Sequence, residues 1–171
     1  MTAIVACGLP AGALLRRVAD AGAYTDCYAV EIPRAVSHAA YVEAFYTTWV
    51  FKLERLILRL LVSRPSTDAE ARQLALGERD DFVAWSVEAR APDQLLLADF
   101  VGRTKSWLMV ARDDGSGSTR LYFGSAVVPV RDRKTGRASL GTVHSALLGF
   151  HKLYSQLLLR AARSRLLRTG K

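Results

Sequence analysis

Asp99 is an acidic residue inside a segment that otherwise has the pattern of a buried strand. The segment, residues 94–101, reads QLLLADFV. A carboxylate in apolar surroundings either shifts its pKa upward or is stabilised by hydrogen-bond donors. The sequence therefore raises the question of which polar groups lie beside Asp99.

A glycine pair between two strand-like segments predicts those neighbours. Gly102 and Arg103 precede the segment 104–111, and a Gly-X pair fits a two-residue type II′ hairpin turn. This turn pairs Asp99 with Ser106. The sequence thus predicts a hydroxyl directly across from the carboxylate.

A second hairpin extends the same row of side chains. If DDGSGS forms the next loop, Arg112 pairs with Thr119, and Ser125 lies beside Ser106. The predicted face then has four rows: Leu95, Val110 and Leu121; Leu97, Leu108 and Phe123; Asp99, Ser106 and Ser125; Val101, Thr104 and Val127. On the opposite face the register sets Trp107 beside Gly124, where the missing side chain leaves room for the indole. One row is therefore polar on an apolar face.

Residues 140–168 predict a long C-terminal helix that faces this row. At 100° per residue its apolar stripe is Leu140, Val143, Leu147, Tyr154, Leu158 and Ala161, with Gln156, Arg160 and Arg163 on the far side. His144 and His151 fall inside the stripe, whereas His38, near a helix start, is expected at the surface. The histidines lack further Cys or His ligands nearby, so neither a metal site nor a cofactor is predicted.

Three interpretations fit a cavity that is lined by a carboxylate, two imidazoles and two hydroxyls. The first is a binding site for a hydrophobic or amphipathic small molecule, with ligand contacts from Asp99, Ser106, Ser125, His144, His151, Leu97, Leu108, Phe123 and Tyr154. The second is an enzyme of the cyclase or isomerase kind, in which Asp99 and His144 or His151 move protons. The third is structural: the serines hold Asp99 as a cross-strand lock, and the histidines are satisfied core residues.

The elements that position these groups follow an α+β order within a single domain, residues 1–171. Residues 24–32 predict a strand, Ser37 opens a long helical pattern with a break at Thr47 and Thr48, and Ser66 precedes a short helix to about Leu76. Strand-like runs follow over 82–89, 94–101, 104–111 and 119–130, then the final helix. Residues 1–22 are read as an N-terminal extension.

This order, with DFVGRTKSWLMV, RLYFGSAVVPV and ALLGFHKLYSQLLLRAA, resembles a bacterial family of unknown function in the START-like, or helix-grip, superfamily, which includes polyketide cyclase-like and lipid-transfer proteins. The resemblance implies an antiparallel sheet curled around the C-terminal helix, and a cavity for a lipid- or polyketide-like molecule. It assigns no catalytic residue. The strands predicted here are fewer than the seven usual in that superfamily.

Positive charge is concentrated at the C-terminus. Residues 131–171 hold ten Lys or Arg against Asp132, a local +9, and residues 1–130 carry −1, which together give the net +8. Such a helix could bind an anionic membrane surface. Nucleic acid is not expected as a partner, because no recognition motif or aromatic-interleaved basic strand is present.

The remaining features bear on partners and compartment. The second sheet face carries Leu96, Phe100, Trp107, Met109 and Tyr122. This apolar face must be shielded from solvent, either by the first helices or by a second copy of the chain in a homodimer. Cys7 and Cys27 could pair, but two cysteines in a chain of this size favour a reducing compartment without disulfides, and cytoplasmic localisation is the expectation.

Overall fold

The computed structural model of the chain describes residues 3–53, 66–131, 138–139 and 142–169, with side chains described over 3–53, 66–129 and 152–169. In chain order the elements are β1 (Val5–Ala6), α1 (Arg16–Asp20), β2 (Tyr24–Ile32), α2 (His38–Tyr46), α4 (Asp68–Leu76), β3 (Asp81–Phe82), β4 (Trp85–Ala91), β5 (Gln94–Asp99), β6 (Thr104–Asp113), β7 (Ser118–Val127), β8 (Val130–Arg131), β9 (Ala138–Ser139) and α5 (Thr142–Thr169).

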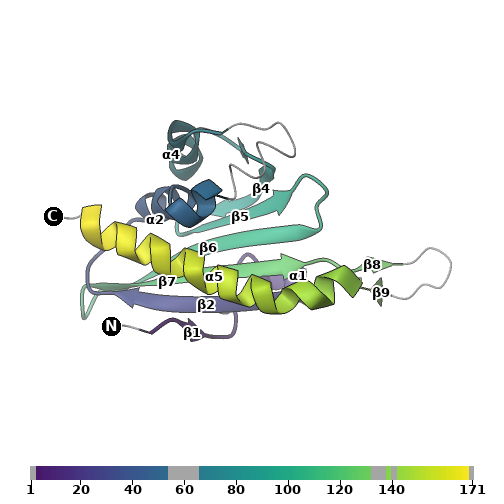
Figure 1. Cartoon of the computed structure of the whole chain (residues 1–171). Helices are drawn as coiled ribbons and strands as arrows, with labels where there is room; N and C mark the ends of the chain where they lie inside the picture. The colour runs from purple at the N-terminus through teal and green to yellow at the C-terminus, as the bar shows by residue number, and fades with distance from the viewer. Residues whose placement is uncertain (1–2, 54–65, 132–137, 140–141, 170–171) are drawn as a thin grey trace.

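The strands form an antiparallel sheet with α5 lying across one face (Figure 1). The sheet has seven strands in the order β1-β2-β7-β6-β5-β4-β3, and β8 and β9 form a separate pair before α5. This arrangement confirms the predicted α+β class, with the antiparallel sheet, the helices after the long strand and the long C-terminal helix. Of the seven strands in this sheet, sequence reasoning missed β1 and β3, which are two residues each and lie at its two edges. The short pair of β8 and β9 was also not predicted.

The predicted register of the β6–β7 hairpin is confirmed. Ser106 pairs with Ser125, and Trp107 pairs with Gly124. A Cβ atom on Gly124 would lie 2.9 Å from Cε3 of Trp107 and 3.1 Å from the backbone oxygen of Asp26. Glycine is therefore required here by the close approach of the indole, as the pattern predicted.

The predicted register of the β5–β6 hairpin is wrong by two residues. Leu97, and not Asp99, pairs with Ser106. The reason is the turn: the Gly102 N–H donates to the Asp99 carbonyl at 2.8 Å, and Gly102 has a φ of +75° at the end of this turn. Glycine supplies the left-handed conformation that closes a longer loop, so the strands meet two residues earlier than a two-residue turn would allow.

Two of the described helices, α2 and α4, begin at residues whose side chains cap them. Ser37 caps α2 by accepting a hydrogen bond from the Ala40 N–H, as predicted. The predicted break follows, because the Thr48 hydroxyl donates to the Phe45 carbonyl and accepts from the Phe51 N–H at the start of a helical segment over residues 49–53. Thr67, one residue after the predicted Ser66, caps α4 in a reciprocal capping box with Glu70.

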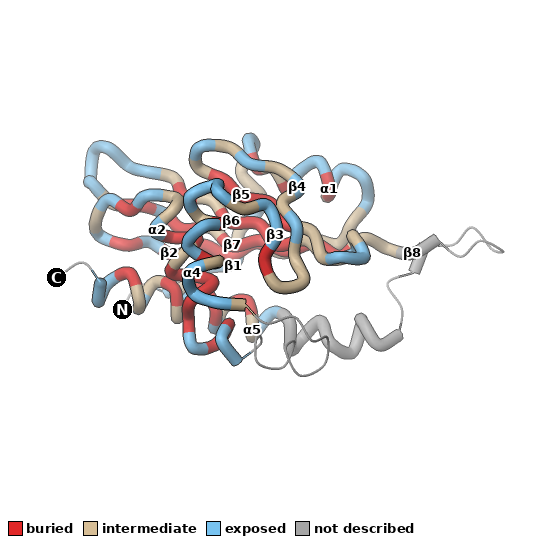
Figure 2. Tube along the Cα trace, turned by 90° about the horizontal axis from the view of Figure 1, so that it is seen from above, coloured by how far each residue is buried: buried red, intermediate tan, exposed pale blue. Residues whose placement is uncertain are grey.

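Each face of the sheet has its own apolar core. Figure 2 shows buried residues around β6 and β7, in the middle of the sheet. On one face, side chains from β2, β5, β6 and β7 pack against α2, α4 and α5. On the other, Trp107, Leu96 and Cys27 are covered by Ala13, Leu15 and Val18 from the N-terminal segment. This cover was not predicted: the first predicted helices, α2 and α4, pack on the other face, and the segment around α1, read from the sequence as an N-terminal extension, covers this one.

The buried stripe of α5 differs from the predicted one. Its buried residues are Ser155, Leu158, Leu159, Ala162 and Leu166, whereas Tyr154 and Ala161 are half-buried. The helix is therefore rotated about its axis relative to the prediction. The side chains of His144 and His151 lie outside the described residues, so their predicted direction toward the sheet stays a prediction.

Candidate functional site

A polar row crosses the sheet beneath α5, and its carboxylate is Asp26. Ser125 pairs with Ser106 on one side and with Asp26 of β2 on the other. The Ser125 hydroxyl donates to Oδ1 of Asp26 at 2.6 Å, and its backbone N–H donates to the same oxygen at 3.2 Å. Such short hydrogen bonds to a carboxylate are among the stronger ones in proteins.

Asp99 occupies a different environment from the predicted one. Its Oδ1 accepts a hydrogen bond from the Arg103 N–H at 2.7 Å within the β5–β6 turn. It pairs across the sheet with Trp85, not with a serine. The structural role of this carboxylate is to stabilise the turn, which is common for aspartate at such positions.

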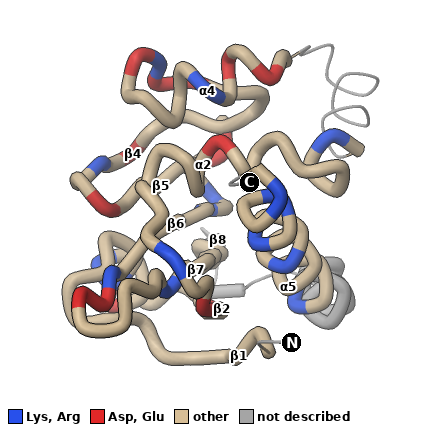
Figure 3. Tube along the Cα trace, turned by 90° about the vertical axis from the view of Figure 1, so that its left-hand side faces the viewer, with Lys and Arg blue, Asp and Glu red and all other residues tan. Residues whose placement is uncertain are grey.

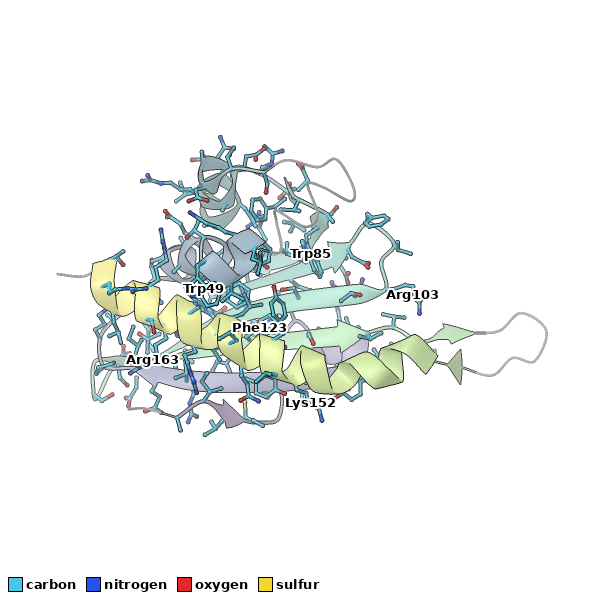
Figure 4. The ribbon with its side chains drawn as sticks, viewed as in Figure 1. Trp49, Trp85, Arg103, Phe123, Lys152 and Arg163 are labelled. Carbon is cyan, nitrogen blue, oxygen red and sulfur yellow. The ribbon has the colours of Figure 1, made fainter. Side chains whose placement is uncertain are left out.

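A cavity of about 190 Å³ lies between the polar row, α2 and α5. Its described lining is rich in aromatic rings and hydroxyls: Phe45, Tyr46, Phe51, Trp85, Thr104, Lys105, Ser106, Phe123, Ser125, Tyr154, Ser155 and Leu158. Figure 4 labels two of these residues, Phe123 and Trp85. An engineered apolar cavity of about 150 Å³ is known to hold benzene, so this volume suits one substituted aromatic ring.

The aromatic walls pack against one another. The ring centroids of Phe45 and Phe123 lie 4.9 Å apart, and those of Tyr46 and Phe51 lie 4.8 Å apart. The Tyr46 hydroxyl and the Ser106 hydroxyl are 3.2 Å apart and share a hydrogen bond. Interlocked rings hold their rotamers, so the walls are preformed rather than assembled by a ligand.

Ser155 lines the cavity, and its hydroxyl is not satisfied within the part of the protein that the structure describes. Its side chain is fully buried, and its Oγ has no hydrogen-bond partner within the described chain. Burying a hydroxyl without a partner costs about 1–3 kcal/mol by mutational measures, and such groups are rare in native proteins. Because Ser155 also lines the cavity, its hydroxyl is a candidate to bind a polar atom of a guest molecule.

His38, expected at the surface, is half-buried. Its Nε2 is buried without a hydrogen-bond partner among the described residues. Burial lowers the pKa of its imidazole below the usual 6.5, a nearby Arg90 charge adds to the lowering, and a backbone hydrogen bond at Leu108 and the Asp93 charge oppose it. His38 is not among the residues that line the cavity.

Sequence reasoning found part of the lining and missed part. Of the nine predicted ligand contacts, the cavity brings together Ser106, Ser125, Phe123 and Tyr154. Leu97 and Leu108 are buried in the core on the same face, and Asp99 lies in the turn. Asp26, Tyr46 and Ser155 were missed. Ser155 could have been found from the sequence, since it directly follows Tyr154 of the predicted stripe. Asp26 could not, because its place beside Ser125 depends on the pairing of β2 with β7, and the two residues are 99 positions apart in the chain.

A second hollow of about 620 Å³ opens at the surface where β2, β6 and β7 carry Glu31, Arg112 and Arg120. Its lining is mostly charged and polar, and Arg120 is paired with Glu31 at 3.3 Å. The smaller, apolar cavity is the better candidate for ligand binding, since apolar walls with few polar groups are typical of small-molecule sites.

In the described part of the chain, no helix has both the length and the apolar run that crossing a bilayer requires. Among the same residues, no three His, Cys, Asp or Glu side chains gather closely enough to hold a metal ion.

No family model matches the chain, and no curated protein matches it in sequence. Among solved structures, the chain is similar to the crystal structure of CalU16 from Micromonospora echinospora, at 11% identity over 96% of this chain and 92% of that chain, with a TM-score of 0.32. A similarity at this TM-score carries no argument about function. The START-like resemblance therefore stays a prediction at the level of the family, and the function is inferred from the geometry of this chain alone.

Proposed function

We propose that the protein binds a small aromatic molecule that carries a hydroxyl or carbonyl group, in the cavity between the sheet and α5. The observation that carries the proposal is the unsatisfied hydroxyl of Ser155, a residue that lines a cavity rich in aromatic rings. The rings give the site its affinity for a flat apolar body, and the hydroxyl gives it a preference for a polar substituent.

The size of the cavity limits the ligand. At about 190 Å³ it holds one ring with substituents, not a long acyl chain. A small apolar body with one polar group belongs to the amphipathic class predicted from the sequence. The serines of the polar row are less available than Ser155, because Ser125 already donates to Asp26 and Ser106 bonds with Tyr46.

The catalytic alternative built on Asp99 finds no support. A proton-transfer group must lie within hydrogen-bond reach of the substrate, and Asp99 is outside the cavity lining. The proposal is therefore a binding function without an assigned reaction.

Binding of 4-bromophenol and bromobenzene tests the proposal, because the two probes differ by one hydroxyl. Titration calorimetry of wild-type protein should show a preference for 4-bromophenol. A hydrogen bond contributes about 0.5–1.5 kcal/mol net, which corresponds to roughly a 2- to 10-fold difference in Kd. Ser155→Ala should abolish that preference, and Ser164→Ala, on the exposed face of the same helix, should keep it.

A second pair of variants tests the cavity itself. Ser155→Leu should fill the space and abolish binding of both probes, while Ser164→Leu should leave both affinities unchanged. Equal affinity of wild-type protein for the two probes, or unchanged binding in Ser155→Leu, would contradict the proposal.

A second candidate function rests on the outward face of α5. Leu153, Leu157 and Leu167 are 67%, 39% and 37% exposed, and they recur at helical spacing along this face. The exposed cations Lys152, Arg160 and Arg168 lie on the same helix, and Figure 3 shows Lys and Arg along it. Exposed leucines among cations are typical of helices that lie on an anionic bilayer surface.

We therefore propose that α5 docks on anionic membranes, where each cation near the surface contributes about 1 kcal/mol. Flotation with vesicles of phosphatidylglycerol should capture the protein, and vesicles of phosphatidylcholine should not. Arg160→Ala should weaken capture roughly fivefold, and added salt should reduce capture further. Capture by both vesicle types alike, or dimerisation of the free protein through these leucines, would contradict this role.

A further inference from the structure

Cys7 and Cys27 face each other across two neighbouring strands at the edge of the sheet. The β1–β2 register pairs Val5 with Ala29 and Ala6 with Tyr28, and its continuation sets Cys7 opposite Cys27. The Cys7 N–H donates to the Cys27 carbonyl at 3.0 Å, and the two Sγ atoms are 3.5 Å apart. Both are free thiols.

We propose that Cys7 and Cys27 are a redox-active pair, which peroxide converts to a disulfide that joins the N-terminal segment to β2. Directly opposed residues in a hydrogen-bonded antiparallel pair have Cα atoms about 5.5 Å apart, which is within the range that disulfides span. The sulfurs already touch, so the bond forms by side-chain rotation with little backbone movement.

The two cysteines differ in accessibility, which sets the order of the steps. Cys7 is half-buried and Cys27 is buried. Burial is the largest cause that raises the pKa of the Cys27 thiol, so Cys27 stays protonated and Cys7 is the sulfur that meets the oxidant.

The chemistry balances with peroxide as the oxidant. The Cys7 sulfur attacks one oxygen of hydrogen peroxide, the O–O bond breaks, a sulfenic acid forms, and the other oxygen leaves as water. The Cys27 sulfur then attacks the Cys7 sulfur, the S–O bond breaks, and the hydroxyl leaves as water with the Cys27 proton. Two thiols are oxidised to one disulfide, and one peroxide is reduced to two waters.

The disulfide would fasten the cover of the second core. Cys27 packs in that core with Trp107 and Leu15, and the loop closed by the bond carries Leu15 and Val18. Closing a loop restricts the unfolded chain, so the oxidised protein should have the higher Tm. This site is independent of the ligand cavity, which lies on the opposite face of the sheet.

Intact mass spectrometry of the full chain tests the proposal. Reduced protein is treated with an equimolar amount of hydrogen peroxide and then with iodoacetamide. Wild-type protein should lose both thiols together, take up no alkyl group, lose two hydrogen atoms in mass, stay monomeric on a non-reducing gel and show a higher Tm. Cys27→Ser should instead accumulate a Cys7 sulfenic acid that dimedone traps, and Cys7→Ser should keep its Cys27 thiol.

Three results would overturn the inference. The first is wild-type protein with both thiols still open to alkylation. The second is a disulfide between two chains. The third is sulfinic acid on Cys7 beside a Cys27 that still alkylates. The wild-type measurement needs no variant, so a folding defect in either serine variant leaves the inference open to refutation.

Discussion

Replacing Ser155 with alanine should make the ligand-free protein more stable. Most substitutions in a core destabilise a protein, but this one removes a hydroxyl that is fully buried and has no partner within the described chain. The cost of such a group in mutational measurements is about 1–3 kcal/mol, and the substitution returns that amount to the free energy of unfolding.

A control is needed, because alanine also favours helix over serine by up to about 0.7 kcal/mol. Ser164 lies on the exposed face of the same helix, so Ser164→Ala measures the helix preference alone. Ser155→Ala should exceed Ser164→Ala by about 1–3 kcal/mol.

A third variant should change the free energy of unfolding in the opposite direction. Ser125 lines the same cavity but donates to Asp26 at 2.6 Å, so Ser125→Ala removes a hydrogen bond to a charged group. Such bonds contribute about 1.5–3 kcal/mol, and this variant should be less stable than wild type by about that amount.

Urea unfolding followed by tryptophan fluorescence measures all three variants, with stability taken from the midpoints at a common m value. A Ser155→Ala variant no more stable than Ser164→Ala would refute this prediction, because the hydroxyl of Ser155 would then be satisfied in solution. It is equally refuted if Ser125→Ala and Ser155→Ala change stability in the same direction.

Three further predictions concern the fold. Gly124→Ala should lower the free energy of unfolding by about 1–3 kcal/mol in the same assay, because the new methyl group would meet Trp107 at 2.9 Å and Leu15 at 3.0 Å; a neutral result would show that the indole moves aside. Thr67→Ala should cost about 1 kcal/mol by removing the capping box of α4, and thermal unfolding without a change in Tm would contradict that. Burial lowers the folded-state pKa of His38, so its contribution to stability is complete above pH 6.5 and is lost as pH falls through the folded value; His38→Leu should therefore lose less stability than wild type between pH 7.5 and pH 5, and identical losses would contradict the assignment.

The β6–β7 hairpin could be predicted from sequence because two independent signals agree there. The polar residues Ser106 and Ser125 align on one face, and Trp107 aligns with Gly124 on the other. A shift by one residue would reverse the faces and destroy both matches. The longer strands, the capping residue Ser37 of α2 and the start of α4 to within one residue were predictable for a similar reason, since they depend on neighbours in the chain.

The β5–β6 register could not be predicted from the sequence in the same way. A shift by two residues keeps every side chain on its own face, so the alternation of apolar and polar residues is the same for both registers. The turn decides between them, and a single glycine with positive φ fits both a two-residue loop and the longer loop that forms. Asp99 was assigned to the polar row for this reason, but Leu97 lies beside Ser106, and the carboxylate of the row is Asp26, on the other side of Ser125.

The rotation of α5 was missed because leucines occupy both sides of the helix. Leu158, Leu159 and Leu166 are buried, while Leu153 and Leu157 are exposed. A helix with apolar residues on more than one face has no unique buried stripe, so packing against β2 and α2 selects one. This packing of α5 is what places Ser155 at the cavity.

The most direct test of the binding site is a crystal structure of the protein soaked with 4-bromophenol, in which the anomalous signal of bromine locates the probe. We predict a bromine peak inside the cavity beside Phe123 and Tyr154, with the phenol oxygen within hydrogen-bond distance of the Ser155 hydroxyl. A bromine peak in the charged hollow at Arg112 and Arg120, or no peak within the cavity, would contradict this prediction.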